Sequence, residues 1–171
     1  EIIDPRKYEK TESFINEYYK LRQRKGVTLN EAKKNMLSDR NYFGAMMVKN
    51  GDADGMVSGI TKHYPDTIRP ALEIVGKEDE YKVVSGMYIL TTKSSTYFLA
   101  DTTVNIDPNA EELADITLQT ANFVKNFDII PKVALLSYSN FGSVKGEIPT
   151  KIKDSLKIIQ NRNPKLMVDG D

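Results

Sequence analysis

The feature that most constrains the fold is the order of segments in the second half of the chain. The run Lys132–Ser137 (KVALLS) is short and mostly apolar, which is typical of a strand buried in a sheet. A helical pattern follows from about Pro149 to Arg162, and the apolar run Leu166–Val168 comes next. This order is typical of a parallel βαβ unit. The sequence therefore predicts a three-layer α/β/α fold, in which helices cover a mostly parallel or mixed sheet.

A β-hairpin and a long helix are expected ahead of this unit. The segments Val83–Thr91 and Thr96–Ala100 are rich in β-branched and aromatic residues, and a polar stretch separates them. This pattern favours a hairpin. Asn109 or Asp107 is expected to cap the next helix, because both side chains can accept hydrogen bonds from the first amides of a helix.

Two polar loops follow predicted strands in this half of the chain. Ligands of open α/β sheets bind beyond the carboxyl ends of the strands, so loops 101–107 and 137–143 are both placed to line a site. The second loop is a weak candidate phosphate cradle, since ordinary strand-to-helix loops look similar. Its candidate ligands are Ser137, Ser139, Gly142 and Ser143. Neither G-x-x-x-x-G-K-[ST] nor G-x-G-x-x-G occurs, which argues against a P-loop NTPase or a dinucleotide fold.

Two helices are predicted near the start of the chain. Aromatic and apolar residues recur at roughly helical spacing over Tyr8–Arg24, and Gly26 ends that pattern. Thr28 opens the second helix, because Thr28-Leu29-Asn30-Glu31 is a capping box. We expect this helix to continue to about Ser38.

The stretch Tyr42–Gly76 is predicted to begin with a pair of short strands. Phe43–Val48 and Met56–Ile60 are apolar runs, and turn signals at Asn50-Gly51 and Asp54-Gly55 lie between them.

A helix with a possible anion site is predicted after these strands. Asp66 or Thr67 would cap it, so that Arg69 falls in its first turn. Such a helix start offers free N–H groups and a positive dipole end to an anion, and the guanidinium fork suits phosphate or carboxylate. By position alone, Arg69 either binds an anion or pairs with a structural carboxylate.

Composition excludes several function classes. The chain has no cysteine, which rules out thiol catalysis, disulfides and Cys-ligated metals within it. Its 24 basic residues equal its 24 acidic ones, so a dominant nucleic-acid or membrane surface is not expected. No apolar run approaches the roughly 20 residues of a membrane span, and no signal peptide is visible. We therefore expect a cytoplasmic protein.

Neither the loop aspartates nor the single histidine form a recognisable metal or acid–base motif. The segment Asp52–Gly55 lacks the bidentate acid that an EF-hand carries twelve places along its loop, so turn formation explains it better. His63 has no acid or nucleophile partner at a readable spacing. We expect no metal site and a non-catalytic histidine.

The charged connector Lys77–Tyr81 is the best candidate for a lobe boundary, which gives possible lobes of residues 1–77 and 78–171. The sequence starts without Met, and Met167–Asp171 reads as a strand leading into a loop. Both ends suggest a fragment, residues 1–171, of a longer chain.

Five motifs occur in an order that resembles the phosphate acetyl/butyryl transferase family, and together they cover nearly the whole chain. The motifs are LRQRKGVTLNEA (Leu21–Ala32), YFGAMMVKNGDADGMVSG (Tyr42–Gly59), DTIRPALEIVG (Asp66–Gly76), FLADTTVNIDPNAEELADI (Phe98–Ile116) and PKVALLSYSNFGSVKG (Pro131–Gly146). The variants GITKHYPDTIRP and LLSYSNFGS resemble more particularly the transferase-like C-terminal domain of hybrid NADP-dependent malic enzymes.

The resemblance implies a two-lobed α/β fold of the isocitrate/isopropylmalate dehydrogenase type, with the site in a cleft between the lobes. Members of the family move an acyl group between coenzyme A and inorganic phosphate, and they are commonly dimers. The implied ligands are therefore acetyl-CoA, coenzyme A or phosphate. The implied partners are a small molecule and further copies of the chain, in a dimer or larger oligomer.

Position by position, the resemblance implies that Thr67 and Arg69 contact coenzyme A or the phosphoryl group. Arg22 matches the arginine of the L-R-x-x-K-G motif, which is also assigned to the cleft. The family's Ser-Arg pair and the Asp credited with activating the thiol lie downstream of the strand that matches Leu166–Val168. No catalytic residue is therefore expected in this sequence.

Three functions remain open. The favoured one is an acetyl-CoA-sensing, oligomerising domain of an NADP-dependent malic enzyme. NADP and a divalent metal would then bind only an upstream domain, which decarboxylates malate oxidatively to pyruvate and CO2. The alternative is an active phosphate acetyltransferase, which converts acetyl-CoA and phosphate to acetyl phosphate and coenzyme A. The third is an assembly surface built on the aromatic first helix.

Overall fold

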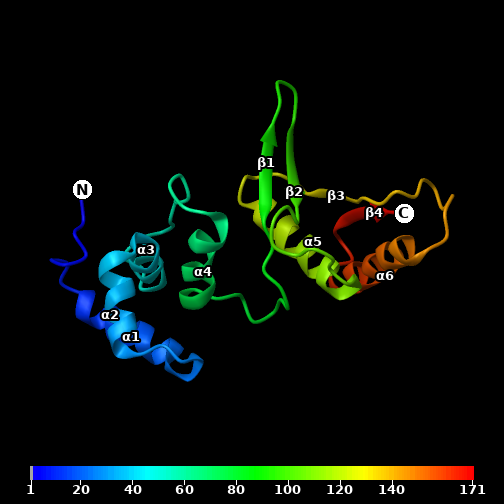
Figure 1. Cartoon of the computed structure of the whole chain (residues 1–171). Coiled ribbons are helices and arrows are strands. Elements are labelled where there is room, and N and C mark those ends of the chain that lie inside the picture. The colour runs from blue at the N-terminus through cyan, green and yellow to red at the C-terminus, as the bar shows by residue number, and fades with distance from the viewer. Residues whose placement is uncertain (1) are drawn as a thin grey trace. The chain divides into compact units, whose positions relative to one another are not determined.

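The computed structural model of the chain describes residues 2–171 and divides into two units, Glu1–Lys77 and Glu78–Asp171 (Figure 1). The described residues of the first unit form helices and no strand, whereas the second unit combines helices with small sheets. None of the helices in residues 2–171 is long and apolar enough to cross a membrane.

The first unit packs four α-helices, α1 (Thr11–Arg22), α2 (Leu29–Ser38), α3 (Arg40–Lys49) and α4 (Tyr64–Ile74), with a 3-10 turn (Gln23–Lys25) after α1. Their apolar faces meet in one core. Its buried members are Phe14, Ile15, Tyr18, Ala32, Met36, Phe43, Ala45, Met46 and Ile74. The capping box at Thr28 is confirmed, because its hydroxyl accepts from the Glu31 amide at 3.2 Å and its own amide donates to the Glu31 carboxylate at 2.8 Å.

The prediction of two strands in this unit is wrong. Phe43–Val48 lies inside α3, and Met56–Ile60 belongs to the irregular loop before α4. Asp39 caps α3 by accepting from the Asn41 amide at 2.9 Å. Phe43 and Met46, three residues apart, are then both buried on one helical face. A six-residue apolar run does not by itself distinguish a short strand from part of a buried helix.

Helix α4 also starts earlier than predicted. His63 is its N-cap, Pro65 lies in its first turn, and Arg69 falls in the second turn rather than the first. Pro70 is therefore an interior proline, which cannot donate to the carbonyl of Asp66. The expectation that the free amides of a helix start surround Arg69 is wrong, because those amides lie one turn earlier.

The second unit contains two small sheets and two helices. Strands β1 (Met87–Thr91) and β2 (Thr96–Ala100) pair antiparallel, and β3 (Lys132–Leu135) pairs parallel with β4 (Met167–Gly170). Helices α5 (Ala110–Lys125) and α6 (Glu147–Arg162) pack on each other. The core of this unit consists of Tyr81, Ala114, Leu118, Leu135, Ile152 and Ile159. The α/β class and the β3–α6–β4 unit are thus confirmed, although the described strands form two separate two-stranded sheets.

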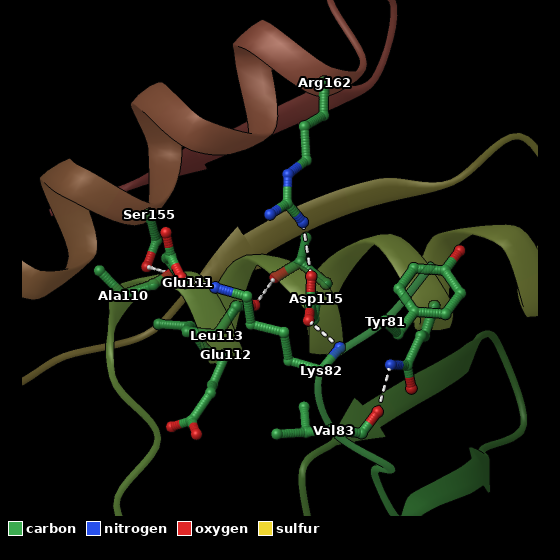
Figure 2. A network of polar contacts seen from close by, with 12 residues as sticks. Tyr81, Lys82, Val83, Ala110, Glu111, Glu112, Leu113, Asp115, Ser155 and Arg162 are labelled. Carbon is green, nitrogen blue, oxygen red and sulfur yellow. Dashed lines mark hydrogen bonds and ion pairs between the residues drawn. The ribbon is translucent and has the colours of Figure 1, made fainter. Parts of the chain in front are cut away.

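A polar network fixes the segment that enters β1 (Figure 2). Asp115 on α5 is fully buried. Its carboxylate accepts from Arg162 of α6 at 2.5 Å and from the backbone amide of Lys82 at 2.6 Å. Gln119, one turn further along α5, donates to the carbonyl of Val83 at 2.7 Å. Because side chains take up these backbone groups, the strand predicted from Val83 begins only at Met87.

Candidate functional site

A pocket of about 260 Å³ lies in the first unit. It is formed by the start of α3, the loop before α4 and the first two turns of α4. Its lining residues are Asp39, Tyr42, Thr61, Lys62, His63, Asp66, Arg69 and Pro70. Asp66, Arg69 and Pro70 share one face of α4 because they are spaced three and four residues apart.

Of the two strong bases that line this pocket, Lys62 forms an ion pair within the described part of the chain and Arg69 does not. Lys62 Nζ pairs with Asp39 Oδ2 at 2.7 Å. Within residues 2–171, no hydrogen bond or ion pair holds the guanidinium of Arg69. Asp66 also lines the pocket, in the first turn of α4, where the helix dipole favours a carboxylate. Arg69 is therefore the cation most available to an incoming anion, and Asp66 opposes that anion.

Tyr42, which lines the pocket, is hydrogen-bonded to the carboxylate of Glu73, which lies outside the lining. Tyr42 donates through its hydroxyl to Glu73 Oε2 at 3.1 Å, and Tyr18 donates to the same oxygen at 2.9 Å. Arg22 Nη2 lies 3.4 Å from Glu73 Oε1. Burial, reinforced by Glu73, raises the pKa of both tyrosines. Both phenols therefore remain protonated donors at neutral pH.

The residues predicted in this half of the site lie in different settings. Arg69 lines the pocket. Thr67 is not in the lining, and its hydroxyl donates to the carbonyl of His63 at 3.3 Å within α4. Arg22 is likewise outside the lining and faces Glu73. Ligand contacts by Thr67 and Arg22 stay predictions, and the geometry of this pocket adds no support to them.

The loop predicted as a phosphate cradle lies in the second unit and is bound to Asp171. The hydroxyl of Ser137 donates to the Asp171 carbonyl, and the amide of Gly142 donates to its carboxylate. The amide of Ser139 donates to the Ser137 hydroxyl at 2.9 Å, and Ser143 Oγ accepts from the amide of Asn140 at 3.2 Å. One amide of the loop, that of Gly142, thus donates to a carboxylate of the same chain. Phosphate binding by this loop stays a prediction.

The loop at 101–107, also expected to line a site, is organised by Asp101. Its carboxylate accepts from the amides of Gly86 at 3.0 Å, Thr103 at 2.9 Å and Asn105 at 2.7 Å. Burial opposes ionisation of this carboxyl, but hydrogen bonds from the amides of Thr103, Val104 and Asn105 outweigh it and lower the pKa to about 2. Both oxygens of Asp101 are engaged, so its role in this unit is structural.

Several residues that line the pocket, and one residue behind it, were not predicted as site residues. His63 was expected to be non-catalytic and was not proposed as a ligand, and it lines the pocket together with Lys62 and Asp39. Glu73 was not singled out either, although it lies one turn beyond Arg69 on the same face of α4. That spacing was a readable signal, whereas the approach of Tyr18 and Tyr42 to Glu73 depends on tertiary packing.

The model of the family described as phosphate acetyl/butaryl transferase matches residues 1–171, the whole chain. The chain belongs to this family.

Curated proteins of two kinds match along nearly all of the chain. The phosphate acetyltransferase of Bacillus subtilis (strain 168) is 40% identical over 170 residues, which are 99% of this chain and 52% of the relative. The NADP-dependent malic enzyme of Escherichia coli (strain K12) is 37% identical over 171 residues, which are 100% of this chain and 22% of that enzyme. The chain thus spans about half of the B. subtilis transferase and a smaller share of the malic enzyme.

Solved transferase structures share the fold. A phosphotransacetylase from Streptococcus pyogenes superposes with a TM-score of 0.89 at 41% identity, over 99% of this chain and 52% of that one. The EutD phosphotransacetylase from Staphylococcus aureus gives 0.85 at 32% identity, over 100% of this chain and 52% of that one. Relatives named as phosphate acetyltransferase and as NADP-dependent malic enzyme thus both match nearly the whole chain.

Proposed function

We propose that the chain is part of a phosphate acetyltransferase, which transfers an acetyl group between coenzyme A and inorganic phosphate. The observation that carries the proposal is the guanidinium of Arg69, which lines a pocket of about 260 Å³ and has no hydrogen-bond or ion-pair partner among residues 2–171. The chain is also 40% identical to a phosphate acetyltransferase. The sequence alone favoured the malic-enzyme domain and gave the transferase as the alternative, so the proposal reverses their order.

The chemistry of the pocket suits a phosphate group. A guanidinium presents a planar fork of donors that matches two phosphate oxygens, and such charge-assisted bonds are stronger than neutral ones. The volume is below the roughly 300–1,000 Å³ typical of pockets that enclose drug-sized ligands. The pocket therefore fits inorganic phosphate, or the phosphoryl end of a larger ligand, rather than the whole of coenzyme A.

The proposed reaction places negative charge where Arg69 would act. The sulfur of coenzyme A forms a bond to the carbonyl carbon of acetyl phosphate, and the bond between that carbon and the phosphate oxygen breaks. The electron pair stays on the phosphate, which also gains the thiol proton in the net reaction. A fixed cation beside the departing phosphate stabilises the transition state more than the ground state. Arg69 would thus bind and stabilise phosphate rather than transfer a proton.

Arg69→Ala tests this proposal in the full-length protein, with Arg24→Ala as the matched control on an exposed site. Loss of the charge-assisted bonds should weaken phosphate binding about ten-fold or more and slow acetyl-CoA formation from acetyl phosphate and coenzyme A. The control should leave both unchanged. Equal phosphate affinity in the Arg69→Ala variant and the unchanged protein, measured by calorimetry, would remove Arg69 from the site.

The second candidate is the acetyl-CoA-sensing domain of an NADP-dependent malic enzyme. It is favoured by the 37% identity to the E. coli enzyme over the whole chain. In this case NADP and a divalent metal bind elsewhere in the longer protein, and the pocket binds acetyl-CoA as an effector in a homo-oligomer. Malate-dependent NADP reduction that responds to acetyl-CoA, without acetyl transfer, would establish this function and overturn the first.

A further inference from the structure

Three donors from two other helices meet at the carboxylate of Glu73 on α4. Tyr18 and Arg22 belong to α1, and Tyr42 belongs to α3. The two phenols share Oε2, at 2.9 and 3.1 Å, and the guanidinium of Arg22 lies 3.4 Å from Oε1. The Glu73 side chain is only 18% exposed. A mostly buried carboxylate needs its hydrogen-bond donors in fixed positions. Glu73 therefore forms a rigid junction between the three helices.

Only one of these donors reaches the pocket. Tyr42 lines it together with Arg69, whereas Tyr18, Arg22 and Glu73 lie outside the lining. The rings of Tyr18 and Tyr42 also pack edge to face, with centroids 5.2 Å apart. The hydroxyl of Tyr42 is thus held by Glu73 and its ring by Tyr18. Residues outside the pocket lining therefore fix the position of Tyr42 in the pocket.

We infer that Glu73 is a positioning residue, through which Arg22 and Tyr18 hold the ring of Tyr42 beside the anion bound at Arg69. The inference rests on the proposed function of the pocket. It gives Arg22 an indirect role, in contrast to the direct ligand contact that the family resemblance implies. Arg22 Nε is buried without a hydrogen-bond partner in the described part of the chain, and the ion pair to Glu73 directs the guanidinium into the helix junction.

A double-mutant cycle on the full chain separates indirect from direct action. Inorganic phosphate and, separately, coenzyme A are titrated by calorimetry into the unchanged chain, Arg22→Met, Tyr42→Phe and the double variant. Tyr42→Phe keeps the ring and removes only the hydroxyl that donates to Glu73. Each single substitution should weaken phosphate binding about five-fold. The double variant should bind phosphate no more weakly than the single variant with the lower affinity, because the two residues act through one junction. Arg24→Met, an exposed neighbour of Arg22, is the control and should bind as the unchanged chain does.

Additive losses in the double variant would mean that Arg22 contacts the anion directly, and they would overturn the inference. Circular dichroism verifies that each variant folds. If Arg22→Met does not fold, Arg22→Lys replaces it in the same cycle, because this variant keeps the charge but loses the fork of the guanidinium.

A ligand-free measurement tests the junction independently. The chain has nine tyrosines and no tryptophan, so its tyrosinate absorbance at alkaline pH comes from tyrosine alone. Glu73→Gln removes the negative charge beside two phenols and should lower the pKa of the tyrosines that titrate last. An unchanged titration would overturn the link between Glu73 and Tyr42. Absence of saturable phosphate and coenzyme A binding by the full-length protein would instead overturn the proposed function, and the tyrosine titration then decides the junction alone.

Discussion

The side-chain amide of Asn41 donates to the backbone carbonyl of Asp66 at 3.5 Å. A helical residue at position 70 would normally bond that carbonyl through its own amide, which Pro70 lacks. Asn41 is 3% exposed, and its Oδ1 accepts from the hydroxyl of Ser58 at 2.6 Å. A buried side chain of α3 thus takes up a group that the proline leaves open in α4.

Asn41→Ala should therefore destabilise the first unit. The substitution leaves the Asp66 carbonyl and the Ser58 hydroxyl without their partner in a part-buried place. The free energy of unfolding should fall by about 1–3 kcal/mol, as measured by urea denaturation. Asn30→Ala, at an exposed position of α2, is the matched control. Equal losses in the two variants would contradict a specific role for Asn41.

Asp66→Asn should strengthen phosphate binding. The Asp66 carboxylate lines the same pocket as Arg69, and its charge repels an incoming anion. Removing one partly solvated charge should raise the affinity about two- to five-fold at low ionic strength. The gain should shrink in 0.5 M salt, because screening weakens exposed charges. Calorimetry with inorganic phosphate at two salt concentrations measures both effects, and weaker binding in this variant would place the anion elsewhere.

Asp101→Asn should change the acid stability of the second unit. The folded chain lowers the pKa of Asp101 from its ordinary 3.8 to about 2. Stability from this carboxylate is therefore complete above its ordinary pKa and is lost as the pH falls through the folded value. The unchanged chain should lose stability between about pH 4 and pH 2, and the variant should show a shallower decline there.

At pH 7 the Asp101→Asn variant should also be less stable by about 1–3 kcal/mol, since the loop amides lose a charged acceptor. Asp107→Asn removes an exposed ion pair with Lys151 and serves as the control. Denaturation curves across the acid range measure both variants. Parallel curves for Asp101→Asn and the unchanged chain would refute the role given to this carboxylate.

Asp115→Ala should be among the most damaging substitutions in the second unit. It leaves the guanidinium of Arg162 and the amide of Lys82 without their shared acceptor (Figure 2). Asp115 is buried, whereas the Arg162 side chain is 38% exposed and regains water when the carboxylate is removed. The loss should therefore be about 1–3 kcal/mol, mainly from the buried amide left without an acceptor. Asp154→Ala, which removes an exposed pair with Lys157 on α6, should cost less than about 1 kcal/mol. Thermal unfolding compares the two, and a small effect of Asp115→Ala would show that water replaces the carboxylate.

Much of the fold was predictable because its signals are local. The capping boxes at Thr28 and Asn109 involve residues three apart, and both are present. The helix and strand pattern that gives β3, α6 and β4 also lies within neighbouring segments. The start of α4 was misplaced because Asp66 or Thr67, rather than His63, was expected to be its N-cap.

The site was harder to predict because it depends on residues distant in sequence. Arg69 was proposed from its expected place near a helix start and from the family resemblance, and it lines the pocket. The Tyr18–Glu73 contact spans 55 positions, and no periodicity of either helix indicates it. Likewise, the pairing of Lys62 with Asp39 follows from how the loop before α4 returns to α3. The sequence therefore indicated Arg69 as a candidate, while packing determined which neighbours surround it.

The junction at Glu73 also bears on how this chain can vary. Three donors compete for two oxygens of one carboxylate, so the effect of replacing any donor depends on which others remain. Substitutions at positions 18, 22, 42 and 73 should therefore be epistatic. Across related sequences these four positions should covary, and a viable change at one should require compensation at another.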